Sequence, residues 1–342
     1  MVEVVTRENL ADYDAFVLRH PLGSFLQSSL WARQKPDWHW RALIRRNQWG
    51  RITGTLAVLC RRVPWLGCSM VYGCRGPVCD PDDRETLDEL LTALKKLARQ
   101  ERAYLVRLDP MMPEGGLTDR FAERGFKVRR RRRSYQPAQP RRAWMLALGS
   151  VPDRIPDTFT PEHRQRVQMA VRRGVTVRRG GRELAAAFTE LMQAAGLREG
   201  RVVRPEAYFT GLMENFGSRA AIYLADYEGR TVAGALVIAY GGKATCVFEA
   251  GDGDVTLPAP YLLRTVILEQ SAAAGCRAAF FPGVFRRRES PEYEFAAGFG
   301  GHLVRYAGEL DLVVRPLTNL LADAAGALAA RFRRWLYFIR VR

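Results

Sequence analysis

The clearest pattern in the chain is an apolar stripe at helical spacing in its first third. Apolar residues recur every three or four positions after Pro81, at Leu87, Leu90, Leu91, Leu94, Leu97 and Ala98. This spacing predicts an amphipathic helix with one face in a core. Asp80 followed by Pro81 is typical of a helix start, so we expect the helix to begin there.

Short β-rich runs flank this helix. Three of them are separated by turn residues, and a fourth ends at Asp109 and Pro110; they are Arg41–Arg46, Ile52–Cys60, Cys68–Tyr72 and Ala103–Leu108. The pattern predicts a three-strand meander, the helix, and one further strand. Shorter helices are expected over Asp12–Arg19, Gln27–Lys35 and Leu117–Arg124.

The second half of the chain repeats this order. Three helices, three strands, a helix and a strand are predicted, at Pro161–Arg173, Glu183–Ala195, Pro205–Phe216, Ala220–Tyr227, Thr231–Tyr240, Lys243–Ala250, Pro260–Ala274 and Cys276–Phe281. The repeated order indicates a duplicated α/β module, although no period is visible at the residue level.

A glycine-rich break follows the second set of elements. A short helix after Pro291 is expected to end at Gly298, Phe299, Gly300 and Gly301, and a strand to run from His302 to Val314. Clustered glycines let the backbone take a positive φ or approach another group closely.

Composition places the chain among globular proteins with a basic surplus. It has 342 residues, 47% of them hydrophobic, with a formal charge of +17 from 53 Lys and Arg against 36 Asp and Glu. A chain of this length has room for two cores. The charge favours polyanionic partners such as RNA, nucleotide diphosphates or an acidic membrane face; the alternative is a basic, solvated surface.

Cysteine and histidine usage argues against a metal centre or a disulfide framework. The six cysteines include no C-x-x-C pair, and the four histidines are scattered. No metal and no cofactor are therefore expected, and the cysteines are expected to be buried thiols. No apolar run approaches the ~20 residues that span a bilayer. Glu3 and Glu8 interrupt the N-terminus where a signal peptide would be apolar, so a cytoplasmic protein is expected.

Five runs together resemble the FemABX family of aminoacyltransferases that build peptidoglycan cross-bridges. They are Phe25–Trp38, with Gln27, Trp31 and Lys35; Tyr72–Val78; Ala103–Asp109; Arg201–Phe209, with Arg204 before Pro205; and Pro291–Val313. They follow one another in the family's order and span nearly the whole chain. The resemblance implies an α/β (α+β) fold of two tandem modules similar to acyl-CoA N-acyltransferases (GNAT), with mixed sheets.

By the same resemblance, residues 1–147 form the first module and residues 148–315 the second, with residues 316–342 returning to pack on the first. The inserted helical arm of some members is absent, so this is a short form of the family.

The resemblance also implies site residues. Lys35 and Arg204 would hold the diphosphate of a peptidoglycan precursor, and the other expected substrate-binding residues are Asp37, Trp38, Tyr104, Tyr208 and Glu249. Asp109 and Arg305 are the catalytic candidates. Three of these residues have a structural alternative: Lys35 can lie on the surface of an amphipathic helix anchored by Trp31, Tyr208 belongs to an apolar stripe, and Asp109 can cap a turn.

Three positions depart from the family pattern. Ala296 follows Phe295 where close relatives have a lysine, Glu249 replaces a tyrosine that contacts the precursor, and Pro282-Gly283 stands where the family has Gly-Gly. We expect Arg286, Arg287, Arg288 or Arg305 to supply the missing cation. An arginine donates hydrogen bonds without acting as a base, so a carboxylate such as Asp109 or Glu249 would take the proton if substrate or water does not.

The function implied is the transfer of an amino acid from an aminoacyl-tRNA to the stem peptide of a precursor, either lipid II or UDP-MurNAc-pentapeptide. Basic residues would contact the tRNA: Arg129–Arg133, Arg141, Arg142, and His163 with the arginines from Arg164 to Arg179. One alternative is an N-acyltransferase with another donor such as acyl-CoA, although no basic-x-x-Gly-x-Gly/Ala loop follows Val71 or Ala250. The other is a non-catalytic member that binds precursor or RNA.

The end of the chain combines apolar and basic residues. Leucines, aromatic residues and arginines interleave from Leu317 to Arg342. This basic amphipathic pattern suits either packing on the first module or a peripheral contact with an anionic membrane. A monomer is expected, in the cytoplasm or at the inner face of the membrane.

Overall fold

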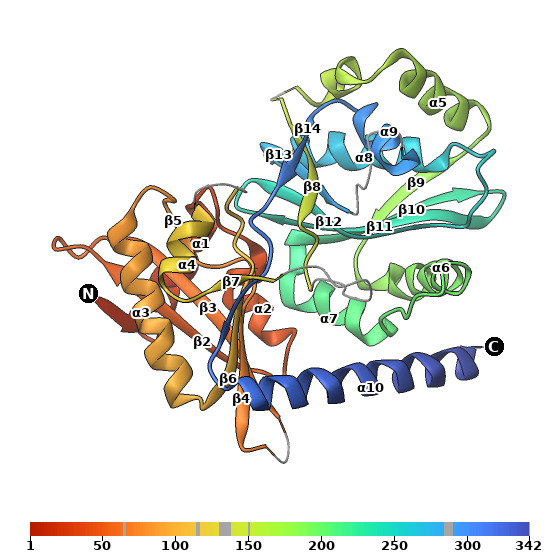
Figure 1. Ribbon diagram of the computed structural model, residues 1–342. Helices are drawn as coiled ribbons and strands as arrows, with labels where there is room; N and C mark the ends of the chain where they lie inside the picture. Colours follow the sequence, from red (N-terminus) through yellow and green to blue (C-terminus); the bar gives the residue numbers. More distant parts are fainter. Residues whose placement is uncertain (64–65, 114–116, 130–137, 150, 284–289, 342) are drawn as a thin grey trace. The chain divides into compact units, whose positions relative to one another are not determined.

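The chain forms two compact units in a computed structural model that describes residues 1–63, 66–113, 117–129, 138–149, 151–283 and 290–341 (Figure 1). The first unit comprises Met1–Arg141 and Arg305–Leu336, and the second Arg142–Val304 and Tyr337–Arg342. Each unit has its own mixed sheet. The expected α/β class is therefore confirmed.

The sheet of the first unit has eight strands. Its order is β1-β2-β3-β4-β6-β15-β7, with β5 paired to β3. The strands are β1 (Val2–Val4), β2 (His39–Arg46), β3 (Ile52–Val63), β4 (Cys68–Gly73), β5 (Val78–Cys79), β6 (Ala103–Leu108), β7 (Lys127–Val128) and β15 (Leu310–Val313). Strands β4 and β6 are parallel, and the other pairs are antiparallel. The late strand β15 thus completes the sheet that the N-terminal residues begin.

Helix α3 (Arg84–Gln100) packs the predicted apolar stripe against this sheet. The six residues of the stripe, Leu87, Leu90, Leu91, Leu94, Leu97 and Ala98, are all buried. The helix begins later than expected, because Asp83 rather than Asp80 accepts the capping hydrogen bond, 2.9 Å from the Thr86 N–H. The other helices of this unit are α1 (Leu10–Arg19), α2 (Ser29–Arg33), α4 (Leu117–Glu123) and α10 (Pro316–Val341), with the short 3-10 turn η1 (Phe25–Gln27).

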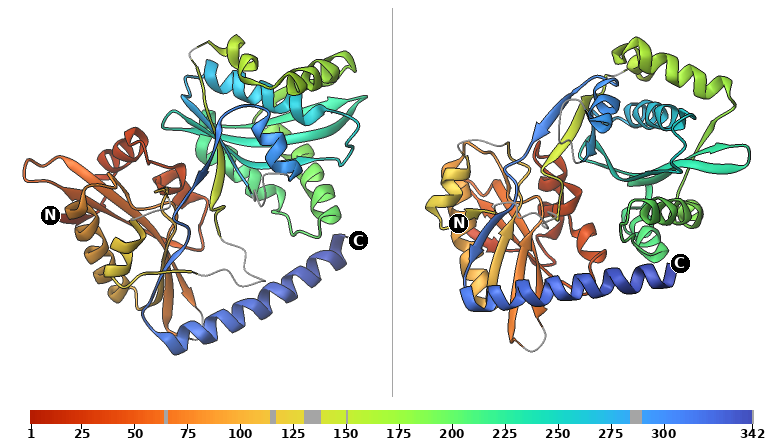
Figure 2. Two further views of the ribbon diagram at one scale, coloured as in Figure 1. Left: turned by 45° about the horizontal axis from the view of Figure 1, so that its top comes forward. Right: turned by 45° about the vertical axis from the view of Figure 1, so that its right-hand side comes forward.

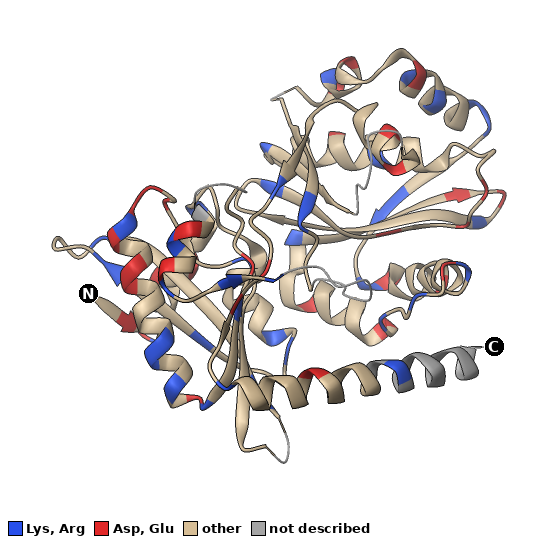
Figure 3. Cartoon of the chain, in the orientation of Figure 1, with Lys and Arg blue, Asp and Glu red and all other residues tan. Residues whose placement is uncertain are grey.

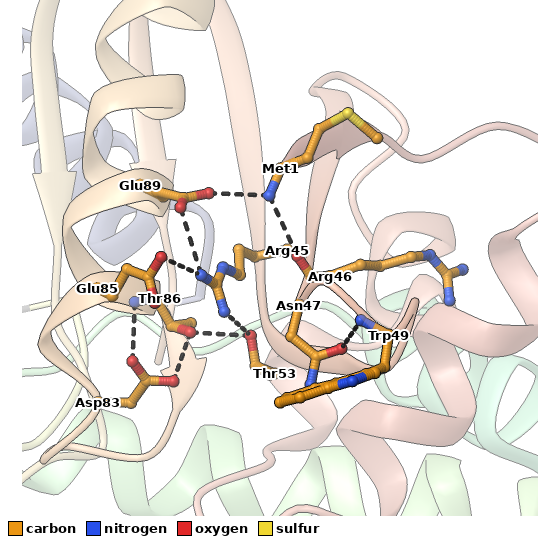
Figure 4. A network of polar contacts seen from close by, with 10 residues as sticks. All are labelled: Met1, Arg45, Arg46, Asn47, Trp49, Thr53, Asp83, Glu85, Thr86 and Glu89. Carbon is orange, nitrogen blue, oxygen red and sulfur yellow. Dashed lines mark hydrogen bonds and ion pairs between the residues drawn. The ribbon is translucent and has the colours of Figure 1, made fainter.

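A buried arginine joins α3 to the edge of the sheet (Figure 4). Arg45 on β2 is 5% exposed and pairs with Glu85 at 2.9 Å and Glu89 at 3.3 Å. It also donates a 3.0 Å hydrogen bond to Thr53. Because removing one partner of a buried ion pair leaves an uncompensated charge, this network ties the helix to one position on the sheet.

The second unit is a seven-stranded sheet with helices on both faces. Its order is β14-β8-β13-β12-β11-β10-β9. The strands are β8 (Arg142–Ala147), β9 (Thr176–Gly180), β10 (Ala220–Tyr227), β11 (Arg230–Tyr240), β12 (Lys243–Gly251), β13 (Ala278–Pro282) and β14 (His302–Arg305). Helices α5 (Pro161–Arg172), α8 (Ala259–Ala273) and α9 (Pro291–Ala297) cover one face, and α6 (Ala185–Arg198) and α7 (Glu206–Phe216) the other (Figure 2).

The two units differ from the expected modules, residues 1–147 and 148–315, because two strands belong to the other unit. Strand β8 pairs with β13 and so belongs to the second sheet. Strand β15 pairs with β6 in the first sheet. Hydrogen-bond pairing, rather than position in the chain, decides where each edge strand goes, and no periodicity in a four- to six-residue strand reveals its partner.

The glycine break after α9 forms as expected. Gly300 and Gly301 have φ values of 83° and 81°, which non-glycine residues rarely adopt. Gly298 packs directly on the His163 ring, where a Cβ would collide. The break therefore fixes the close contact between α9 and α5.

Candidate functional site

The opening motif is organised around the side chain of Gln27, which is fully buried. Its Nε2 donates to the carbonyls of Ala57 at 3.0 Å and Cys74 at 2.7 Å, and its Oε1 accepts from the Ala57 N–H at 2.8 Å. These bonds join the motif to β3 and to the turn after β4. They also break the single helix expected over Gln27–Lys35, since Gln27 ends η1 and α2 starts only at Ser29.

A Cβ at Gly76 would lie 2.6 Å from the Gln27 Nε2, so only glycine fits against this amide. Gln27 and Gly76 lie in different motifs of the sequence. The contact therefore makes the position of the Gln27 side chain depend on the glycine at position 76.

Lys35 lies just beyond α2, in the turn before β2, rather than on the helix. Its Nζ is 5.0 Å from the centroid of the Trp31 ring, a cation–π contact. Its charge also slightly opposes the rise that burial causes in the pKa of the Cys74 thiol. Asp37 is exposed in the same turn, and the Trp38 ring lies 5.6 Å from the guanidinium carbon of Arg61.

Asp109 is 2% exposed and is the centre of a polar network at the end of β6. Its carboxylate accepts hydrogen bonds from the Tyr72 hydroxyl at 2.6 Å and from the Arg75 backbone N–H at 2.6 Å. Burial raises the pKa of Asp109, and the nearby Arg75 opposes that rise. With one hydrogen bond on each oxygen, this carboxylate clearly supports the turn that carries Arg75.

Arg75 extends the network towards the other catalytic candidate. Its Nη2 donates to the Pro140 carbonyl at 2.7 Å, and its guanidinium carbon lies 4.7 Å from the centroid of Tyr306. Arg305, exposed, directly precedes Tyr306. The structure therefore connects Asp109 to Tyr306 through Arg75, while the exposed Arg305 remains a separate catalytic candidate. Arg75 and Tyr306 were missed as site residues, although Arg75 lies in the Tyr72–Val78 motif.

Tyr104 does not join this group. It is the second residue of β6, and Asp109 follows the last residue of that strand, so about 16 Å of extended chain separates them. The Tyr104 side chain packs with Cys68, Leu105 and Ala322 of α10. Burial raises the pKa of its hydroxyl. Helix α10 thus packs, through Ala322, on the cluster that contains Tyr104, the tyrosine that was expected to contact substrate.

Arg204 and Tyr208 lie together at the start of α7 in the second unit. Arg204 is exposed, and its guanidinium carbon is 5.1 Å from the centroid of the Tyr208 ring. Pro205 caps the helix rather than forming its first residue. The Tyr208 ring also lies 6.1 Å from Phe248 on β12. The two residues are therefore paired as the motif suggested.

Glu249 is directed away from Tyr208. Adjacent residues of a strand point to opposite faces of a sheet. Phe248 contacts Phe209 of α7 at 5.3 Å, whereas Glu249 forms a 2.7 Å ion pair with Arg264 of α8. The structure thus separates Glu249 from the Arg204–Tyr208 pair, with which the sequence grouped it.

A pocket of about 330 Å³ opens beside Glu249, wholly within the second unit. Its lining includes Glu199, Glu249, Arg264, Phe281, Glu292 and Phe295. The volume is at the lower end of the range for small-molecule sites.

Ala296, which replaces the lysine of close relatives, is 1% exposed and belongs to the core of the second unit. A lysine at this position of α9 would have to bury its ammonium or disturb the packing.

The basic residues expected to contact RNA divide into several groups. Figure 3 shows Lys and Arg positions on elements of both units, with acidic positions among them. His163 is an exception to the prediction, since it is 6% exposed and its Nε2 lies 3.1 Å from the Phe295 carbonyl oxygen. Arg130–Arg133 and Arg286–Arg288 lie outside the described residues.

The described residues hold neither a cluster of metal-ligating side chains nor a helix suited to cross a membrane. No group of three or more His, Cys, Asp or Glu side chains comes together there as a metal site. None of the helices in those residues has the length and apolarity needed to cross a membrane.

Comparison with known proteins shows the family and the fold that this chain resembles. A model of the FemAB family matches residues 9–231. A "lipid II:glycine glycyltransferase" of Staphylococcus aureus is 32% identical over 212 residues, which are 59% of this chain and 50% of the relative. The match thus spans about half the length of this curated relative.

Solved structures extend the likeness over the rest of the chain. A crystal structure of FemX has a TM-score of 0.82 at 22% identity and covers 93% of this chain and 99% of its own. A tandem GNAT protein from the clavulanic acid biosynthesis pathway has a TM-score of 0.56 at 15% identity, covering 91% and 98%. The predicted fold of two tandem GNAT-like modules is confirmed.

Proposed function

The chain belongs to the FemAB family, and on this premise we propose that it is an aminoacyltransferase that adds an amino acid to the stem peptide of a peptidoglycan precursor. The observation that carries the proposal is the 212-residue similarity to a lipid II:glycine glycyltransferase. The acceptor in this proposal is lipid II or UDP-MurNAc-pentapeptide, and the donor is an aminoacyl-tRNA.

The reaction needs little covalent chemistry from the protein. The acceptor amine attacks the ester carbonyl carbon, a C–N bond forms, and the C–O bond to the terminal ribose breaks. The amine gives up a proton and the ribose oxygen gains one. Because the ester is already activated, positioning and stabilisation of the oxyanion supply most of the rate enhancement.

The first unit offers the features that an anionic acceptor needs. Lys35 presents an ammonium beside the Trp31 ring. In this proposal the exposed Arg305 supplies a second cation, while Arg75, which is 6% exposed, holds its turn through Pro140 and Tyr306. Cations gathered on rigid elements suit a diphosphate, which accepts charge-assisted hydrogen bonds. In this proposal Arg204 at the start of α7 adds a further guanidinium, and Asp109 is a candidate proton acceptor.

The basic surplus supports a nucleic-acid donor. Exposed arginines such as Arg172 and Arg173 near the end of α5 are suited to sequence-independent contacts with phosphates. The chain is further proposed to act as a monomer in the cytoplasm, with a peripheral contact at the inner face of the membrane where lipid-linked precursor would be met.

Mass spectrometry tests the proposal directly. Purified protein is incubated with a mixture of charged tRNAs and either lipid II or UDP-MurNAc-pentapeptide, and the precursor is examined for the mass of one added amino acid. Addition that requires both the charged tRNA and the protein supports the proposal.

Parallel reactions separate the two alternatives. Addition of an acyl group from acetyl-CoA, with none from charged tRNA, would identify an N-acyltransferase with another donor. Retention of the precursor on immobilised protein without transfer from either donor would identify a non-catalytic binding member.

A further inference from the structure

The pocket beside Glu249 has the opposite charge character to the protein that contains it. Among the described residues its lining includes the carboxylates of Glu199, Glu249 and Glu292 and the guanidinium of Arg264; Glu199 is paired with Arg201 at 2.5 Å, and Glu249 with Arg264. The chain as a whole carries 53 basic and 36 acidic residues. An acidic lining in a basic protein favours a cationic ligand over the polyanions that the rest of the surface would attract.

The pocket lies where two parallel strands stop pairing. Strands β12 and β13 are in register only from Lys243 to Thr245 and from Ala278 to Phe280. Strand β12 continues to Gly251, and its last three residues line one wall. A second wall is lined by the last two residues of β13, Phe281 and Pro282, and by Gly283 after them. The site is therefore built from rigid elements rather than from surface loops.

Arg264 is held in place by aromatic rings. Its guanidinium carbon lies 4.2 Å from the centroid of Phe281, 4.3 Å from Phe295 and 5.4 Å from Phe299. The residue is 5% exposed, and its Nε has no hydrogen-bond partner in the described part of the chain. Because this Nε is shielded from solvent, a ligand in the pocket can meet only the terminal nitrogens of the guanidinium.

Glu249 and Arg264 present opposite charges to the same space. Glu249 Oε2 and Arg264 Nη2 are 2.7 Å apart, and about a third of the Glu249 side chain remains exposed. A ligand with an ammonium and a carbonyl oxygen on neighbouring carbon atoms can meet both groups at once. An aminoacyl group has this arrangement, whereas the side-chain amine of an acceptor peptide offers only the ammonium.

We propose that this pocket binds the aminoacyl group of the donor, with its α-ammonium at Glu249 and its carbonyl oxygen at Arg264. The inference rests on the proposed function for the identity of the donor. The family pattern, in which a tyrosine stands at position 249, does not require a carboxylate here, so Glu249 is a feature of this chain.

Binding of small amino-acid amides tests the proposal without any transfer reaction. Glycinamide, L-alaninamide and L-serinamide carry the ammonium and the carbonyl, N-acetylglycinamide lacks the ammonium, and n-butylamine lacks the carbonyl. Each is titrated into the full-length protein and followed by ligand-observed NMR. The amino-acid amides should bind, N-acetylglycinamide should not, and n-butylamine should bind more weakly than the amides.

Two variants locate the site, and one serves as a control. Glu249→Gln keeps the shape of the side chain and an oxygen for Arg264, and it should weaken amide binding about tenfold or more, as expected for loss of a charge-assisted bond. Glu292→Gln should weaken binding by a smaller factor. Glu190→Gln, on the exposed side of α6, should leave binding unchanged.

Several results would overturn the inference. They are the absence of amide binding to the wild type, equal binding of N-acetylglycinamide, equal binding of n-butylamine, and an unchanged affinity in a folded Glu249→Gln variant. This test can be separated from that of the proposed function. Amide binding at Glu249 with no transfer to the precursor would refute only the transferase proposal. Transfer to the precursor without amide binding would refute only the proposed role of the pocket.

Discussion

Asp109 accepts a 2.6 Å hydrogen bond from the backbone N–H of Arg75, a non-glycine residue held at a φ of 58°. Left-handed backbone at such a residue persists when its surroundings stabilise it. Here a buried carboxylate does so, and it directs the Arg75 side chain towards Pro140 and Tyr306. The residue expected to act in catalysis therefore has a structural role as well.

Substitution of Asp109 separates these two roles. Asp109→Ala leaves the Tyr72 hydroxyl and the Arg75 N–H without their acceptor, at a cost of roughly 1–3 kcal/mol for each buried donor. Asp109→Asn keeps an oxygen that can accept the Arg75 N–H. Its free energy of unfolding, measured with urea, should therefore fall much less than that of Asp109→Ala. If Asp109 takes the proton, the folded Asn variant should lose transfer activity; retained activity would leave Asp109 with the structural role alone.

Lys35 and Arg204 are predicted to bind the precursor diphosphate. Lys35→Ala and Arg204→Ala should each weaken precursor binding by roughly 1.5–3 kcal/mol, the range for hydrogen bonds to charged groups. Isothermal titration with UDP-MurNAc-pentapeptide measures the affinity. Lys96→Ala and Arg230→Ala, at other exposed positions, serve as matched controls. Unchanged affinity in both test variants would remove these residues from the site.

The cation that replaces the family's lysine is predicted to come from Arg305. Arg305 is exposed, so Arg305→Ala should fold normally and lower kcat for transfer, while Arg305→Lys should restore part of it. Equal rates in all three proteins would contradict this assignment. Ala296→Lys is a poor test of the same point. Ala296 is 1% exposed, and burial of an ammonium there should lower the melting temperature before activity can be compared.

Glu309 gives the first unit a pH-dependent stability. Glu309 is 6% exposed, its Oε2 has no hydrogen-bond partner among the described residues, and burial raises its pKa despite Arg107. A carboxyl group whose pKa is higher in the folded than in the unfolded state stabilises the folded protein. This stabilisation is complete below the unfolded pKa of about 4.3 and is lost as the pH rises through the folded pKa. Glu309→Gln, which does not titrate, should therefore gain stability relative to the wild type as the pH increases.

Urea unfolding from about pH 4.5 to pH 8 measures this difference. Asp83→Asn is the matched control, because hydrogen bonds from Thr86 lower the pKa of Asp83 despite desolvation. The contribution of Asp83 is lost only as the pH falls through its folded pKa, below this window, so its difference from the wild type should stay flat. A flat difference for Glu309→Gln as well would show that Glu309 is not destabilised by burial.

Helix α10 is predicted to contact an anionic membrane. Leu317, Leu320, Leu321 and Leu328 are 60–80% exposed on this helix, while Ala322 packs on the first unit. The triple variant Leu317→Gln, Leu320→Gln, Leu321→Gln keeps the packed position and removes exposed apolar surface. It should sediment less with anionic vesicles than the wild type, as should a chain ending at Arg315. Equal sedimentation of all three proteins would exclude a membrane role for the helix.

The motifs named candidate site residues but did not describe the surroundings of those residues. Lys35 was expected on the face of a helix and lies in a turn, because it directly precedes Pro36, which disfavours helical backbone at the residue before it. Arg75 was not predicted as a site residue, because its motif also suits any strand-to-helix turn. Its N–H contacts Asp109, 34 positions away, and neither local sequence indicates this contact.

The sequence by itself determined the family, the fold class and most of the elements, because these follow from local signals: the stripe of α3, the turn residues of the meanders and the order of the motifs. Only the tertiary structure decided which sheet receives β8 and β15, that Ala296 is buried, and that Glu249 faces Arg264 rather than Tyr208. The physical reason is that pairing, burial and the face of a strand depend on residues distant in the chain. Glu249 and Phe248 are neighbours in sequence, yet the pleat of β12 directs one to α8 and the other to α7.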